Sequence, residues 1–180
     1  MFHGLAFYTK LDSQQLLDFR RKYDPTVDLM EDHISIIFPI PDEISERQIS
    51  THIDGILTPW KPFKVHINGY VKSWDHWLFL TLGEGNEKVN RLFKEMFTGI
   101  LKPYLRSDLP FLPHISAGYF GKGQFNIFNP KDELDEEKYR LAQTEIEEIN
   151  IDVWRQIDVF TLVSLNDELT ELRNIKEFII

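Results

Sequence analysis

The sequence contains no cysteine, which excludes disulfide bonds and thiolate metal sites. It also lacks any apolar run approaching the ~18 residues that would predict a membrane-spanning helix. The first residues, MFHGLAFYTKLDSQQ, show no basic segment followed by a long apolar stretch, so we expect no signal peptide. Together these features lead us to expect a cytoplasmic protein.

Sequence motifs for metals and nucleoside triphosphates are missing as well. There is no H-E-x-x-H pair, no closely spaced cluster of histidine and aspartate, and no Walker-type loop. We therefore expect no metal ion and no cofactor. A histidine-based metal site is the alternative, and the spacing of the histidines argues against it.

Positive charge is in short supply. The chain has 20 Lys and Arg against 29 Asp and Glu, a formal net charge of −9. Non-specific binding to nucleic acids depends on many Lys and Arg contacts with phosphates, so we expect no long nucleic acid partner. A small cyclic phosphate, a nucleotide or an RNA end needs only a local positive pocket and stays open as a partner. The sequence gives no indication of membrane binding and none of the oligomeric state.

The patterns that are present indicate an α+β protein. With 180 residues and 42% hydrophobic residues, the chain can bury a sizeable core, and we expect one domain, 1–180, made of two interlocked lobes. Apolar and β-branched runs predict strands at 4–10, 33–40, 63–73, 76–83, 112–120, 151–166 and 170–180. Helical spacing predicts helices at 11–23, 44–57, 86–105 and 131–150.

Two segments of the chain nearly repeat each other. DHISIIFP begins at Asp32 and PHISAGYF begins at Pro113. Each His-Ile-Ser run closes a unit of strand, helix and strand, once over 4–38 and again over 76–120. This internal symmetry predicts two similar lobes, each with helices on one face of an antiparallel sheet.

On a strand, residues i and i+2 face the same side. His33 and Ser35 should therefore point one way, and His114 and Ser116 likewise, opposite to the apolar residues between them. Two such strands facing one site would surround a small anion with two imidazoles and two hydroxyls. The alternative is two half-buried strand histidines without a joint role.

These residue types suit phosphoryl transfer. A neutral imidazole can take a proton from water or a ribose hydroxyl, and a protonated one can give a proton to the leaving oxygen. Hydroxyl groups can hold the non-bridging oxygens and stabilise their charge in the transition state.

Other residues near the second motif are weaker candidates for substrate contacts. The same alternation places Gly118 and Phe120 on the side of His114, where Phe120 could stack a base. Lys122 follows in GYFGKGQ (118–124), which is either a phosphate cradle or a plain turn. The RRK run at 20–22 is expected to be a solvated helix end, and the four tryptophans are expected to be core or lobe-interface residues.

The two H-x-S motifs on strands, in a chain of this length, resemble the 2H phosphoesterase superfamily, which includes the bacterial 2′-5′ RNA ligase and cyclic phosphodiesterase-type proteins. RRKYDP, FTGIL and FLPHISAGYF look most like its small YjcG-like branch. The resemblance implies a bilobal, pseudo-twofold α+β fold of two antiparallel sheets, with helices on the outer faces and a central cleft.

For function, the resemblance implies opening of 2′,3′-cyclic phosphates or transfer at 2′-5′ linkages, without metal or ATP. Carried over by position, His33 and His114 would be the catalytic pair, and Ser35 and Ser116 would bind the phosphate. Many members have threonine where this chain has serine, and serine lacks the methyl group that helps to fix the rotamer. A non-catalytic module that binds a nucleotide or phosphorylated ligand is the alternative.

Overall fold

The computed structural model describes residues 1–106, 110–123, 125, 133–168 and 170–180, and its helices and strands follow the order that the sequence predicts. In chain order the elements are β1 (Phe2–Tyr8), α1 (Gln14–Tyr23), β2 (His33–Pro41), α2 (Glu46–Leu57), β3 (Phe63–Lys72), β4 (Trp77–Leu82), α3 (Asn86–Met96), the 3₁₀ helix η1 (Gly99–Tyr104), β5 (His114–Tyr119), α4 (Glu136–Ile149), β6 (Val153–Ile157), β7 (Val159–Leu165) and β8 (Leu172–Ile179).

The strands form two antiparallel sheets of four. Sheet A has the order β2-β1-β7-β8 and sheet B the order β5-β4-β3-β6. The edge strands β2 and β5 contact each other, so the two sheets meet along the strands that carry the His-Ile-Ser motifs. The predicted α+β fold with two antiparallel sheets is confirmed.

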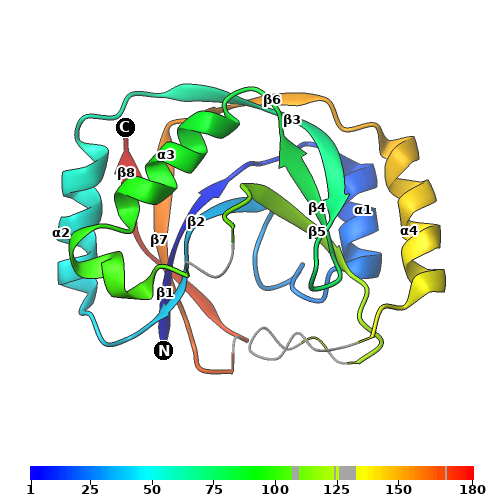
Figure 1. Ribbon diagram of the computed structural model, residues 1–180, viewed down its shortest axis with the longest axis horizontal. Helices are drawn as coiled ribbons and strands as arrows, with labels where there is room; N and C mark the ends of the chain where they lie inside the picture. Colours follow the sequence, from blue (N-terminus) through cyan, green and yellow to red (C-terminus); the bar gives the residue numbers. More distant parts are fainter. Residues whose placement is uncertain (107–109, 124, 126–132, 169) are drawn as a thin grey trace.

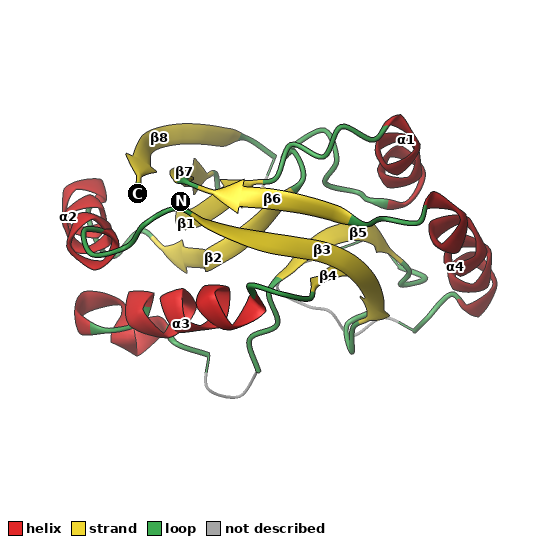
Figure 2. Ribbon diagram, turned by 90° about the horizontal axis from the view of Figure 1, so that it is seen from above, coloured by secondary structure: helices red, strands yellow, loops and turns green. Residues whose placement is uncertain are grey.

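The helices cover the outer faces of the sheets, in two pairs. Figure 1 shows α2 and α3 on one side of the strands and α1 and α4 on the other. Each half of the repeat lends its helix to the opposite sheet: α1 follows β1 of sheet A and packs on β5, while α3 follows β4 of sheet B and packs on β2. The view from above in Figure 2 shows the same separation of the helix pairs. Buried residues from both sheets form one continuous hydrophobic cluster.

Local sequence signals explain where the helices begin. Ser13 caps α1, its hydroxyl accepting a hydrogen bond from the Leu16 amide at 3.2 Å. α2 begins with a capping box between Ser45 and Gln48. The start of α3 depends on Gly85, which precedes the helix with a φ of +87°, and a Cβ there would lie 2.3 Å from the Lys64 carbonyl oxygen. Only glycine fits that turn.

Two predicted elements are divided in the structure. The helix predicted over 86–105 stops at Met96, and the chain continues as η1, which contains Pro103. The strand predicted over 151–166 is two strands that belong to different sheets, β6 in sheet B and β7 in sheet A. Only Asp158 separates them, so the apolar pattern runs through the crossing without a turn signal. Part of the helix predicted over 131–150 lies outside the described residues, and α4 begins at Glu136.

In the described part of the chain, no helix is both long enough and apolar enough to cross a membrane.

Candidate active site

The two motif histidines occupy equivalent places in the two sheets. His33 begins β2 and His114 begins β5, the strands at which the sheets meet. Both motifs alternate in burial as predicted: Ile34 and Ile115 are fully buried, while the histidines and serines of the motifs keep part of their surface exposed. His33 and Ser35, and likewise His114 and Ser116, therefore face away from the helices.

Both rings are held by the same hydrogen bond. Nδ1 of His33 lies 2.8 Å from the carbonyl oxygen of Glu31, and Nδ1 of His114 lies 2.6 Å from that of Leu112. In each case the carbonyl belongs to the residue two positions earlier. Because a carbonyl only accepts, Nδ1 carries the proton and donates it, which leaves Nε2 of the neutral ring as a proton acceptor.

The surroundings of His114 favour its neutral form. Burial lowers the pKa of His114 to about 4, against the opposing effect of the Leu112 carbonyl, and the charge of His33 lowers it further. The Phe79 ring stacks on the imidazole, with ring centroids 3.6 Å apart. This apolar cover explains the loss of hydration.

His33 is shifted in the same direction. Burial lowers its pKa below the ordinary value of 6.5, while the Glu31 carbonyl opposes the shift and the charge of Arg20 adds to it. With both pKa values lowered, the unliganded pair is mostly neutral at pH 7. An anion placed between the rings would favour protonation of one of them, which is the state that acid–base catalysis needs.

A buried ion pair supports the segment that leads into His33. Arg20 of α1 donates from Nε and Nη2 to Oδ2 of Asp24, at 3.0 and 2.8 Å. Arg20 also donates to the Met30 carbonyl at 3.1 Å, and Asp24 accepts from the amide and the hydroxyl of Thr26. The prediction of a solvated helix end is therefore wrong for Arg20, which is only 4% exposed. The i, i+4 spacing of Arg20 and Asp24 is the sequence signal that could have revealed the pair.

Strand β5 changes face after Ser116. Ser116 lies opposite Phe79 of β4, whereas Gly118 lies opposite the next residue, Leu78, so Ala117 is an extra residue in β5. Such a β-bulge reverses the alternation of the residues that follow it.

The predicted positions of Gly118 and Phe120 on the histidine side are wrong for this reason. Gly118 faces α1, where an added Cβ would lie 2.7 Å from Cβ of Tyr23. Phe120 is fully buried and packs against Tyr23 and Tyr139, which belong to the two helices outside sheet B. Phe120 is a core residue of sheet B.

Lys122 lies beyond the end of β5, where Gly121 forms an isolated bridge with Leu134. Its Nζ makes an ion pair with Oε2 of Glu133 at 3.0 Å, and its amide donates to the Glu133 carbonyl. The structure thus shows Lys122 engaged with Glu133 rather than with the motif residues. Gln124, at the end of the predicted glycine-rich cradle, lies outside the described residues.

The tryptophans divide into two kinds. Trp60 and Trp77 are buried as predicted, but Trp74 and Trp154 are 63% and 45% exposed, so the core prediction is wrong for them. Trp154 of β6 is stacked with His66 of β3.

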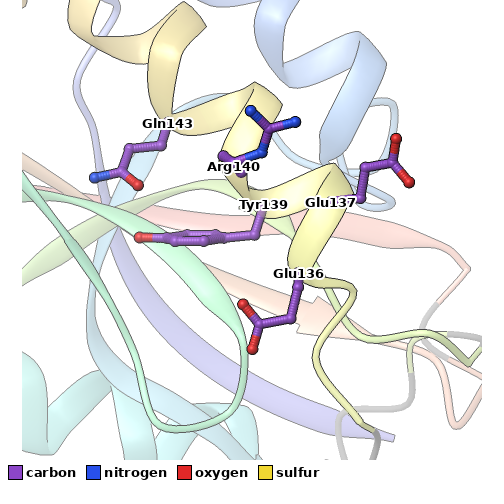
Figure 3. Close-up of a pocket in the computed structure, with 5 residues that line it drawn as sticks. All are labelled: Glu136, Glu137, Tyr139, Arg140 and Gln143. Atoms are coloured by element: carbon purple, nitrogen blue, oxygen red, sulfur yellow. The ribbon is translucent and has the colours of Figure 1, made fainter.

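A hollow lies beside α4, lined by Glu136, Glu137, Tyr139, Arg140 and Gln143, all from that one helix (Figure 3). Among the residues that the structure describes, no group of three or more His, Asp or Glu could hold a metal ion. The predicted central cleft stays a prediction.

Known proteins share this architecture along nearly the whole chain. The fold is similar to E. coli LigT complexed with phosphate, with a TM-score of 0.59, 14% identity, and 99% of this chain and 96% of that chain covered. It is similar to TT0787 of Thermus thermophilus (TM-score 0.60, 15% identity, 99% and 97% covered) and to Kluyveromyces marxianus Usb1 (TM-score 0.56, 14% identity, 96% of both covered). Structures of LigT complexed with NADP+, ATP and 3′-AMP match as well. A comparison with curated proteins finds no match.

A family model supplies the sequence link that identities this low do not. The model of the 2′-5′ RNA ligase superfamily matches residues 9–151, a range that includes both His-Ile-Ser strands. The finer assignment to the YjcG-like branch stays a prediction. The match over most of the chain, together with the shared fold, means that the chain belongs to the 2′-5′ RNA ligase superfamily, the 2H phosphoesterases.

Proposed function

We propose that this protein is a metal-independent phosphoesterase that opens 2′,3′-cyclic phosphates or acts on an RNA terminus, with His33 and His114 as its acid–base pair. The observation that carries the proposal is the matched hydrogen bond from each Nδ1 to the carbonyl two residues earlier. It fixes both rings in one tautomer and leaves both Nε2 atoms for proton transfer. Two unrelated strand histidines would have no reason to share that arrangement.

The reaction needs the two rings in different protonation states. One neutral Nε2 takes a proton from the attacking water while the water oxygen forms a bond to phosphorus. The other, protonated ring gives its proton to the ribose oxygen as the bond from that oxygen to phosphorus breaks. The pair ends as it began, with one neutral and one protonated ring, but the two rings have exchanged these states.

The serine hydroxyls are proposed to hold the phosphate. Ser35 and Ser116 lie two residues beyond their histidines, on the same faces, and each keeps part of its surface exposed. Hydroxyl donors aimed at the non-bridging oxygens would stabilise the charge that builds up there in the transition state. The LigT complexes with phosphate, ATP and 3′-AMP support a small phosphorylated ligand as the partner.

The test is hydrolysis of 2′,3′-cyclic nucleotides by single variants. His33→Ala and His114→Ala should each lose nearly all turnover and keep their circular dichroism spectra. His52→Ala is the matched control, because His52 lies on α2, outside the two motifs, where its Nε2 donates a hydrogen bond to the Met96 carbonyl. Activity should persist in EDTA. Wild-type activity that disappears in EDTA, or full activity in either motif variant, would refute the proposal.

One observation favours a binding module as the second candidate. Both histidines have lowered pKa values, so the resting pair has few protons to give at pH 7. A module of this kind would bind phosphorylated ligands through the serines without turnover. Calorimetric binding of 3′-AMP, combined with no hydrolysis of any cyclic nucleotide between pH 5 and pH 8, would select this alternative.

A further inference from the structure

A second aromatic site lies on sheet B, away from the two motifs. The imidazole of His66 on β3 stacks on the indole of Trp154 on β6, with centroids 4.5 Å apart and planes within 4° of parallel. The carboxylate of Asp152 accepts a hydrogen bond from Nε2 of His66 and fixes the plane of that ring. Trp154 is nevertheless 45% exposed. A large aromatic ring that is held rigid and left open to solvent suits stacking with another flat ring.

This aromatic pair faces the same side of sheet B as His114. His66 and Trp154 lie opposite each other, and the neighbouring residue Ile67 is fully buried on the helix side. A bulge at Asn68 then reverses the alternation of β3, so that Gly69 lies opposite Thr81. Thr81 in turn lies opposite His114. His114, Thr81, Gly69, His66 and Trp154 therefore all lie on the same face of sheet B.

The surface between them is low and polar. Gly69 and Gly83 contribute no side chains there, and a Cβ at Gly83 would lie 2.7 Å from Oδ1 of Asn68. The Asn68 amide, which is exposed, makes no hydrogen bond within the described residues. Lys64 is also exposed and shares the face of His66, and none of the described carboxylates pairs with it. Besides stacking, binding of single-stranded nucleic acid needs positive charge for the backbone phosphates, and hydrogen-bonding groups add to it. Lys64 supplies the positive charge here, and the Asn68 amide supplies hydrogen-bonding groups.

We propose that the stacked pair of Trp154 and His66 binds a nucleobase of an RNA end whose terminal phosphate lies between His33 and His114, with Lys64 contacting a backbone phosphate. The inference rests on the proposed function and narrows its substrate class from small cyclic phosphates and RNA ends to RNA ends alone. Three strand spacings of about 4.8 Å and two residue steps of about 3.3 Å put Trp154 on the order of 15 Å from His114 along the sheet. That is beyond the reach from a phosphate to the base of its own nucleotide. The substrate is therefore an oligoribonucleotide end, in preference to a mononucleotide.

The experiment compares two substrates that carry the same reacting group. One is a 2′,3′-cyclic mononucleotide and the other a triribonucleotide that ends in a 2′,3′-cyclic phosphate. Trp154→Ala and His66→Ala should lower kcat/KM at least tenfold for the trinucleotide and leave the mononucleotide within twofold. His66→Phe, which keeps a flat ring against the indole, should restore most of the difference.

Two controls separate stacking from a general loss of structure. Trp74→Ala removes the other exposed tryptophan, in the turn between β3 and β4, and should change neither substrate. Lys64→Gln should weaken trinucleotide binding and make it less dependent on salt. Equal losses for both substrates, or no loss for either, in Trp154→Ala and His66→Ala would overturn the inference.

Binding measurements distinguish this inference from the proposed function. If the wild-type protein hydrolyses neither substrate, the proposed activity fails, and calorimetry with a triribonucleotide 3′-phosphate still tests the aromatic pair. At least tenfold weaker binding of that ligand to His66→Ala, with unchanged binding of 3′-AMP, would support the site. Equal affinities of wild-type protein and His66→Ala for the trinucleotide would overturn it.

Discussion

The lowered pKa values of the two motif histidines predict an acidic optimum for activity. Catalysis needs one neutral and one protonated ring. The value of kcat/KM therefore follows the fraction of free protein in which one of the two imidazoles is protonated and the other is neutral. Burial puts the pKa of His114 at about 4 and that of His33 below 6.5. The profile should therefore be a bell with its maximum below pH 6.5.

The size of the effect follows from the same values. At pH 7 a group with a pKa of about 4 is protonated in roughly one molecule in a thousand. The alkaline limb of the profile is set by the higher of the two pKa values, which lies below 6.5. Above that pKa, kcat/KM should fall about tenfold for each pH unit, including the step from pH 7 to pH 8.

The assay is hydrolysis of a 2′,3′-cyclic nucleotide from pH 4 to pH 9, beside NMR titration of the histidine ring protons. Signals are assigned by their loss in His33→Ala and His114→Ala. NMR needs no activity, so the physical reasoning is tested even if the proposed function fails. A midpoint for His114 at or above 6.5 in the folded, unliganded protein would refute it.

The same shift links pH to stability. Because the pKa of His114 is lower in the folded protein than in the unfolded chain, the unfolded chain binds more protons below pH 6.5. Stability should therefore fall as the pH decreases from about 6.5 towards 4. His114→Ala should show a shallower decrease over that window in urea denaturation. An identical slope in both proteins would contradict the assigned shift.

Three further predictions concern buried side chains. Phe120→Ala should lower the free energy of unfolding by about 3–5 kcal/mol in urea denaturation, because the ring is fully buried, and should leave KM for a cyclic mononucleotide unchanged. A raised KM at unchanged stability would show instead that the ring meets the substrate. His3→Leu should raise the free energy of unfolding by about 1 kcal/mol, since His3 is 1% exposed and neither ring nitrogen has a partner among the described residues; a loss would mean that the ring is bonded. Arg20→Met should cost about 3–5 kcal/mol because it leaves the Asp24 carboxylate buried and unpaired, whereas the exposed neighbour Arg21→Met should cost under about 0.5 kcal/mol. Equal effects of the two arginine variants would contradict the buried pair.

The sequence predicted the elements well where the hydrophobic pattern and the capping residues agree. The strand carrying His33 and the helix capped by Ser13 fall within a few residues of their predicted limits. It failed where one residue changes the register. Ala117 has nothing in its type that marks a bulge, yet it reverses the faces of Gly118 and Phe120. Asp158 likewise separates two strands of different sheets without a proline or glycine.

The sequence predicted that the histidine and serine of each motif share one face of a strand, because the two residues are separated by a fixed spacing of two. The sequence does not predict how the two imidazole rings are oriented or which residues cover them. The Glu31 and Leu112 carbonyls that orient them are main-chain atoms and leave no trace in residue type. The Phe79 ring that covers His114 comes from the neighbouring strand, through a register that only the fold defines.

The exchange of helices between the halves gives a physical reason for keeping both halves of the repeat. β5 is backed by α1, which precedes the His33 strand, and β2 is backed by α3, which precedes the His114 strand. Neither histidine strand can therefore bury its apolar face without the helix of the other half. The Arg20–Asp24 pair lies at the C-terminal end of α1, with Asp24 as the residue that follows the helix. Through its bond to the Met30 carbonyl, Arg20 supports the segment that leads into His33, while α1 covers the sheet of His114. Folding of each half thus positions the other half's histidine, and a substitution that loosens α1 should disturb both rings together.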